Sequence, residues 1–192
     1  MSLTKHIAIY GGSFDPPHIG HQIACMWLTE ALNAELVVVV PTYEHYFGKN
    51  LIDFSHRMRM CELMIDRFPN DDIGVSSAEE RLPKPNTTLG LVEDVKKFYP
   101  DNQIEVVIGT DLISSLHKWH NWDKVAEQAR IVAVGRTGFG NAKSPYDIYQ
   151  YPIELSAVSS SSIRDRIKGG KDITGMVPLK IKRYIEEHGL YV

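Results

Sequence analysis

The sequence predicts an α/β protein: a Rossmann-like, doubly wound parallel sheet with helices on both faces and a small helical part at the C-terminal end. Three observations support this fold. Short runs rich in β-branched residues alternate with longer segments of helical spacing along the chain. One run, residues 35–40, is almost wholly apolar, as a central parallel strand covered on both faces is. Several runs end at Gly or Pro, where the chain is expected to turn into the next helix.

The predicted strands are short, and most of them are followed by a residue that breaks extended structure. Glycine follows the first, fourth and fifth runs, and Pro41 follows the second. In chain order, the expected strands are residues 6–10, 35–40, 73–75, 103–108, 129–134 and 153–155.

The predicted helices carry apolar residues three and four positions apart. In the first of them, Ile23, Met26, Trp27 and Leu28 can share one broad face. Pro69 and Pro100 end the second and third, and Gly189 suits the C-cap of the last. The expected helices are residues 19–33, 55–68, 87–98, 112–116, 122–128, 159–168 and 177–188.

Composition bounds the class of protein. The chain has 192 residues, of which 43% are hydrophobic and 23% charged, so it can bury a core and is expected to form a single domain over residues 1–192. The net charge of −3 argues against binding to a nucleic acid polymer. No apolar run is long enough to span a bilayer, so no membrane association is expected. Cys25 and Cys61 lie in apolar, helix-like runs and suit a reducing cytoplasm as buried thiols.

The first segment that carries chemistry is residues 10–21, Tyr-Gly-Gly-Ser-Phe-Asp-Pro-Pro-His-Ile-Gly-His. A predicted strand runs through two glycines into a helix that begins near Ile19. Glycines let the backbone approach a phosphate closely, and a helix N-terminus supplies unsatisfied N–H groups for it. His18 and His21 are three residues apart and so share a helix face. The segment predicts a polyphosphate site rather than a plain turn with two surface histidines.

This segment also carries a resemblance to a known family. His18-Ile19-Gly20-His21 resembles the H-x-G-H signature of the nucleotidyltransferase superfamily, which class I aminoacyl-tRNA synthetases share. The longer string from Gly11 to His21 is similar to that of the nicotinate (nicotinamide) mononucleotide adenylyltransferases of NAD biosynthesis. The synthetases are far longer and need a tRNA-binding domain that 192 residues cannot hold.

The second segment, residues 158–164, reads Val-Ser-Ser-Ser-Ser-Ile-Arg at a predicted helix start. Hydroxyl groups there can cap the helix or bind phosphate, and Arg164 adds a charged fork. The segment resembles the superfamily string I-S-S-[ST]-x-[IV]-R, which binds the ATP phosphates. We expect Ser161 and Arg164 to bind phosphate and Ser159 and Ser160 to be structural.

The third segment follows the fourth predicted strand and resembles the family's G-x-D…W-x-x-W pattern. Asp111 stands at a strand's carboxyl end, where a carboxylate can accept a hydrogen bond from a ribose hydroxyl. Trp119 is expected to stack on a pyridine ring, and Trp122 to pack in the core. After the next strand, Arg136 resembles the arginine of the family's R-x-G motif and is expected at the ATP site.

Two further segments depart from the pattern of the bacterial family. Residues 84–88 stand where many members carry S-Y-T, and only Thr88 matches, so a plain N-cap for the next helix is an equal alternative. After Pro41 the family often has Pro-His-Lys, whereas this chain offers His45 and Lys49 as phosphate contacts. Arg57 matches a family arginine, although an exposed helix charge is the default expectation for it.

The resemblance implies an enzyme that transfers the adenylyl group of ATP to nicotinate mononucleotide, or also to nicotinamide mononucleotide, with Mg²⁺ bridging phosphates rather than held by a cluster of protein ligands. It implies that the catalytic residues are His18, His21 and Arg164. It implies that the ATP-binding residues are Gly11, Gly12, Ser13, Phe14, Gly20, Arg136, Ser161 and Arg164. It implies that the mononucleotide-binding residues are Asp111, Trp119, Thr88, Lys49 and His45.

Two other functions stay open at this point. The chain could transfer an adenylyl or cytidylyl group to another phosphorylated small molecule, or it could be a non-catalytic nucleotide sensor on the same fold. The pair of histidines together with Arg164 argues against the sensor, because a sensor does not need donors to a transition state. The sequence also leaves the preference between nicotinate and nicotinamide open, and whether the chain forms a homo-oligomer.

Overall fold

The computed structural model describes residues 5–32, 34–44, 48, 50–68, 72–136, 146–155 and 158–192, with the side chains of 136 and 151–155 excepted. Its centre is a sheet of six strands in the order β3-β2-β1-β4-β5-β6, and every neighbouring pair is parallel. The strands are β1 (His6–Gly12), β2 (Leu36–Pro41), β3 (Ile73–Val75), β4 (Gln103–Gly109), β5 (Arg130–Arg136) and β6 (Ile148–Leu155). The predicted doubly wound α/β class is confirmed.

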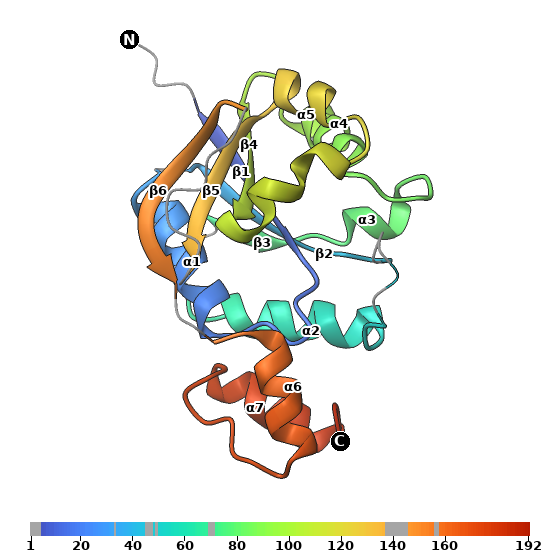
Figure 1. The fold of residues 1–192 in the computed structure, drawn as a ribbon, viewed down its shortest axis with the longest axis vertical. Coiled ribbons are helices and arrows are strands. Elements are labelled where there is room, and N and C mark those ends of the chain that lie inside the picture. The colour runs from blue at the N-terminus through green and yellow to red at the C-terminus, as the bar shows by residue number, and fades with distance from the viewer. Residues whose placement is uncertain are drawn as a thin grey trace.

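Helices cover both faces of this sheet (Figure 1). They are α1 (Ile19–Glu30), α2 (Phe54–Ile65), α3 (Ala78–Arg81), α4 (Thr88–Phe98), the 3-10 helix η1 (Thr110–Lys118), α5 (Trp122–Gln128), α6 (Ser160–Lys168) and α7 (Leu179–Glu187). Strand β1 shows how the two layers arise. Ala8 and Tyr10 face the cluster under α1 and α2, whereas Ile7 and Ile9 face the cluster under α4 and α5. Alternate residues of one strand therefore supply both halves of the core.

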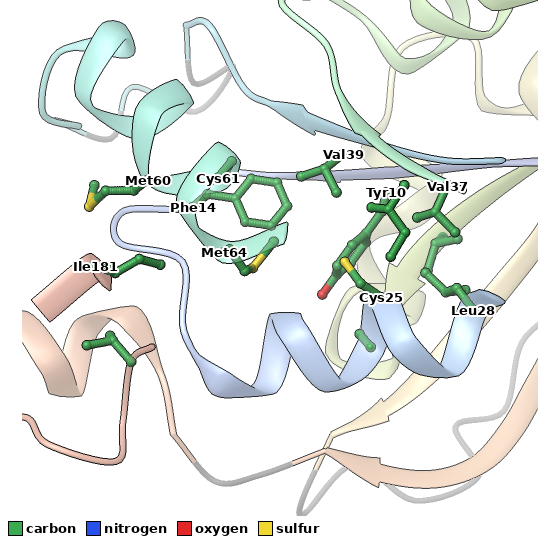
Figure 2. Packing of buried hydrophobic residues seen from close by; sticks show 14 of the residues in the cluster. Tyr10, Phe14, Cys25, Leu28, Val37, Val39, Met60, Cys61, Met64 and Ile181 are labelled. Carbon is green, nitrogen blue, oxygen red and sulfur yellow. The ribbon is translucent and has the colours of Figure 1, made fainter. Parts of the chain in front are cut away.

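Helix α7 packs on α2, and Figure 1 shows α6 and α7 on the far side of α2 from the strands. Ile163 of α6 and Ile181 of α7 are fully buried in the same cluster as Phe14 and Met60. In Figure 2, Ile181 faces the side of this cluster where Phe14 and Met60 lie. The C-terminal helices therefore reach the loop that follows β1.

Three elements differ from the predictions. Helix α3 was not predicted, because four residues are too few to show a helical period. Strand β6 begins at Ile148, five residues before the predicted start at 153. Pro152 lies inside it, which argues against an interior strand, but β6 is at the edge of the sheet, where a residue without an N–H is tolerated. The segment predicted as a helix over 112–116 is a longer 3-10 helix.

No helix in the described parts of the chain is both long enough and apolar enough to cross a membrane.

Candidate active site

A cavity of about 900 Å³ opens at the carboxyl ends of β1, β4 and β5. From β1 the chain first adds β2 and β3 on one side of the sheet, and then adds β4, β5 and β6 on the other side. The strand order therefore reverses between the neighbours β1 and β4. In open parallel sheets, ligands bind in the crevice at such a switch point. The starts of α1, α4 and α6 also reach this cavity, so three helix N-termini lie around it.

The two histidines of the first motif form one unit at the start of α1. Their rings stack with centroids 3.7 Å apart and planes 26° apart. The backbone N–H of His18 donates to Nδ1 of His21 over 3.1 Å. Since Nδ1 of His21 accepts, a neutral His21 ring must carry its proton on Nε2, which then serves as a donor. His18 is only 7% exposed, so it is a buried wall of the cavity rather than a surface side chain.

Gly20 leaves room for the His18 ring. A Cβ at residue 20 would lie 3.1 Å from Cε1 and Nδ1 of His18, closer than ordinary van der Waals contact. The structure thus gives a physical reason for glycine between the two histidines. A Cβ at Gly109 would collide with Oδ1 of Asp111, so the Asp111 side chain would have to turn away.

The Phe14 ring packs against the His21 member of the histidine pair. The ring is 1% exposed and packs edge-on against His21, with centroids 4.9 Å apart, and against Tyr10 at 5.6 Å. The backbone at Phe14 has a φ of 47°, in the left-handed region that residues with a side chain seldom adopt. The buried ring offsets that cost, and the tight turn directs residues 15–18 to the start of α1.

Ser159, Ser160 and Ser161 all line the cavity, but their hydrogen bonds differ. Ser159 is the N-cap of α6: its side chain accepts from the N–H of Ser162, and its own N–H donates back to Oγ of Ser162. Ser160 donates from Oγ to the carbonyl of Pro16 at 2.9 Å, which ties α6 to the first motif. Ser161 is exposed at the cavity and bonded to Arg164. These contacts agree with the prediction that Ser159 and Ser160 are structural.

Arg164 joins the two motifs. Its Nη1 donates to the backbone carbonyl of Asp15 at 2.7 Å and lies 3.7 Å from Oδ2 of the same residue. Its Nη2 donates to Oγ of Ser161 at 3.3 Å. A guanidinium has five N–H groups in a planar fork, so N–H groups beyond these two bonds can serve an anion in the cavity.

Three of the residues expected at the mononucleotide line the cavity from α4, η1 and the residue after η1: Thr88, Asp111 and Trp119. The N-cap of α4 is Thr87, whose side chain accepts from the N–H of Gly90. Thr88 lines the cavity and is not the capping residue. Trp119 also lines it and is half-buried, with its ring edge-on to Trp122 at 5.8 Å. Trp122 is 3% exposed within the core, as predicted.

The structure brings most of the predicted site residues into this single cavity. Its lining includes Gly11, Gly12, Ser13, Phe14, His18, Gly20, His21, Thr88, Asp111, Trp119, Ser161 and Arg164. His45, Lys49 and the side chain of Arg136 lie outside the described part of the structure.

Arg57 is the main residue whose environment the sequence predicted wrongly. It is 1% exposed, not an exposed helix charge. Nε donates to the carbonyl of Ile52 at 3.0 Å and Nη1 to the carbonyls of Ser13 and Thr42 at 3.1 and 2.6 Å. Nη2 donates to the carbonyl of Tyr43 at 3.3 Å. One buried guanidinium therefore fastens the loop after β1 to the loop after β2.

Glu79 and Tyr191 also lie next to the site, although the sequence did not indicate either as a site residue. Glu79 lines the cavity from α3 and accepts through Oε2 from the N–H of Tyr43 at 2.8 Å. Burial raises the pKa of Glu79, and the Tyr43 N–H bond opposes that shift. Tyr191 donates to Asp15 at 2.9 Å. The partners of Glu79 and Tyr191 are distant from them in the sequence, so only folding brings these two residues next to the cavity.

Comparison with known proteins agrees with this geometry. Residues 9–166 match the family model described as cytidylyltransferase-like. The chain is 36% identical over 194 residues to a probable nicotinate-nucleotide adenylyltransferase of Anaeromyxobacter sp. (strain K), which covers 100% of this chain and 99% of that protein. It is 32% identical over 189 residues to the nicotinate-nucleotide adenylyltransferase of Bacillus subtilis (strain 168), covering 97% and 98% of the two chains.

The fold is also that of a solved structure, the Plasmodium falciparum nicotinic acid mononucleotide adenylyltransferase complexed with NaAD, with a TM-score of 0.83, 24% identity and 97% of each chain covered. The full-length likeness to the bacterial relatives, together with the histidine pair and the serine-rich helix start in one cavity, shows that the chain belongs to the nicotinate-nucleotide adenylyltransferase family of the cytidylyltransferase-like proteins.

Proposed function

We propose that the protein is an enzyme of NAD biosynthesis that transfers the adenylyl group of ATP to nicotinate mononucleotide. A phosphate oxygen of the mononucleotide attacks the α-phosphorus of ATP, a new P–O bond forms, and the bond to the β-phosphate oxygen breaks. The products are the deamido form of NAD and pyrophosphate. The observation that carries the proposal is that the His18–His21 pair and the Ser161–Arg164 pair lie in one cavity at the sheet's switch point.

In this proposal no side chain forms a covalent bond, and catalysis consists of positioning and charge stabilisation. His21 donates from Nε2 to the triphosphate, since its Nδ1 is occupied by the backbone N–H of His18. Arg164 and Ser161 hold the triphosphate from the start of α6, where the helix dipole also favours negative charge. Both helix starts thus stabilise the charge that develops on the departing pyrophosphate.

The mononucleotide is proposed to occupy the side of the cavity formed by α4 and η1. Trp119 offers a partly exposed aromatic ring for the pyridine, Asp111 an acceptor for a ribose hydroxyl, and Thr88 a hydroxyl for the pyridine substituent. His45 and Lys49 are proposed to contact the phosphate of the mononucleotide, and Arg136 the ATP.

We propose Mg²⁺ as the cofactor, carried by the phosphates of ATP. The donor set of the cavity fits this mode. No group of three His, Cys, Asp or Glu residues suited to a metal occurs in the described ranges, and Asp15 is engaged by Tyr191 and Arg164. Mg²⁺ commonly keeps several waters and binds through substrate phosphates with few protein ligands. When bound, it would neutralise phosphate charge.

We further propose that residues 1–192 act as one domain in the cytoplasm. Ile163 and Ile181 of the C-terminal helices share a core cluster with β1 and α1, which supports one domain. Cys25 and Cys61 are buried free thiols, and burial raises the pKa of Cys25 to about 12, so it stays an inert thiol in a reducing compartment.

Pyrophosphate release tests the proposal. The protein is given ATP and Mg²⁺ with nicotinate mononucleotide, nicotinamide mononucleotide or ribose 5-phosphate, and the same acceptors with CTP. We expect release with ATP and nicotinate mononucleotide, and a loss of about 10²–10³-fold in kcat for His21→Ala, the size found when one charge-stabilising donor is removed. Release only with another acceptor would identify a different transferase, and nucleotide binding without release would identify a sensor.

A further inference from the structure

Tyr191 lies 176 residues away from Asp15 in the sequence, yet its hydroxyl donates to Oδ1 of Asp15 at 2.9 Å. Tyr191 follows α7, and Asp15 is in the loop after β1 that forms the proposed phosphate site. Tyr191 is not among the described residues that line the cavity, whereas Asp15 is. The bond therefore links the C-terminal helices to the cavity from outside it.

The backbone of Tyr191 is held in an uncommon conformation. Its φ of 68° lies in the left-handed region, which a residue with a bulky side chain seldom adopts. Such a conformation persists where the surroundings impose it. Here the ring packs against the core cluster of α1, α2 and α7 while the hydroxyl reaches Asp15. Burial and the Asp15 charge both raise the pKa of Tyr191, so the hydroxyl keeps its proton and acts as the donor.

The Asp15 carboxylate contacts both Tyr191 and Arg164. The carboxyl group is almost fully buried, at 2% exposure, and a buried carboxylate requires partners. Oδ1 accepts from Tyr191 and, at 3.5 Å, from the N–H of Ile52. Oδ2 lies 3.7 Å from Nη1 of Arg164, which also donates to the Asp15 carbonyl. With Oδ1 anchored, Oδ2 has a fixed direction toward the guanidinium.

We propose that Tyr191 is a positioning residue for ATP: it anchors the Asp15 carboxylate, which in turn orients the Arg164 guanidinium toward the triphosphate. This inference rests on the proposed function in one respect, that Arg164 binds the ATP phosphates. Arg164 has a second anchor in Ser161, so the loss of Tyr191 loosens the guanidinium without removing it. The mononucleotide side of the cavity, on α4 and η1, is untouched by this chain of contacts.

The test is Tyr191→Phe, which deletes only the hydroxyl, with Tyr184→Phe as the matched control. Tyr184 is on α7 and donates to or accepts from Nδ1 of His56 at 2.8 Å, outside the cavity lining. We expect Tyr191→Phe to raise the KM for ATP roughly tenfold, because the hydroxyl's bond is to a charged group, and to change the KM for nicotinate mononucleotide less than twofold. Tyr184→Phe should change neither constant by more than twofold.

A double-mutant cycle separates positioning from general stability. If Tyr191 acts through Arg164, then Tyr191→Phe should have no further effect on ATP in an Arg164→Ala background. Calorimetric affinity for a non-hydrolysable ATP analogue should show the same pattern, and it needs no acceptor. A protein that binds the analogue with this pattern but releases no pyrophosphate would refute the proposed function and keep the positioning role.

Three outcomes would refute the positioning role. The first is an unchanged KM and analogue affinity in Tyr191→Phe. The second is an equal loss in the wild-type and Arg164→Ala backgrounds. The third is a loss matched by Tyr184→Phe at a similar drop in melting temperature, which would reduce Tyr191 to a stabilising contact.

Discussion

Gly20→Ala should separate catalysis from stability more cleanly than removal of either histidine. Gly20 is the second residue of α1, and alanine is favoured over glycine within a helix by up to about 1 kcal/mol. Against this gain, the new Cβ would lie 3.1 Å from the His18 ring. His18 is buried and stacked on His21, so its ring must turn by a small angle, at a cost of about 0.5–1.5 kcal/mol.

These two contributions nearly cancel in stability but not in catalysis. We expect the melting temperature of Gly20→Ala to stay within about 4 °C of wild type, by the usual relation for a domain of this size. We expect kcat to fall at least tenfold, because displacement of a catalytic group by a fraction of an ångström disturbs donors to the developing charge.

The assays are pyrophosphate release and thermal melting, with Gly90→Ala as the control. Gly90 is also near a helix start, and a Cβ there would lie 3.4 Å from Oγ1 of Thr87, an ordinary contact. Gly90→Ala should keep its activity. If Gly20→Ala retains wild-type kcat, or loses as much activity in a His18→Ala background as in wild type, then Gly20 does not act by leaving room for the His18 ring.

Three further predictions each follow from the surroundings of one residue. Arg57→Met should lower the free energy of unfolding by about 3–5 kcal/mol in urea titration, because four backbone carbonyls lose their buried donor and the nearby Asp15 and Glu79 carboxylates lose a positive charge; a loss under 1 kcal/mol would contradict this. Trp119→Ala should raise the KM for nicotinate mononucleotide roughly 5- to 150-fold with little change for ATP, as loss of a stacking ring does; a much lower melting temperature with an unchanged KM would make it a packing residue. Burial raises the pKa of Glu79 above 4.5, so protonation favours the folded state, and that stabilisation is full below pH 4.5 and is lost as pH rises through the raised pKa. Glu79→Gln, which keeps an oxygen for the Tyr43 N–H, should therefore melt higher than wild type at pH 8 and equally at pH 4, and a difference independent of pH would refute the assignment.

Much of the site follows from local sequence. The strand–glycine–helix segment predicted His18 and His21 on one helix face; the two rings do stack, but His18 is the extended N-cap residue before α1 rather than part of the helix. The serine run predicted a helix start, and Ser159 caps α6 there; that Ser161 is the serine that binds phosphate stays a prediction. These features are predictable because helix caps, turns and i to i+3 spacing depend on residues close together in the chain.

The sequence determined the fold class, the alternation of strands with the longer helices, and most segments that form the cavity, because hydrophobic period and turn residues act over a few positions. Only the tertiary structure decided that Arg57 is buried, that Gly20 makes room for His18, and that Tyr191 holds Asp15. Those contacts join segments that are distant in the chain or depend on a side chain's direction. A residue's own neighbours do not specify which loop, helix or carboxylate the folded topology will place against it.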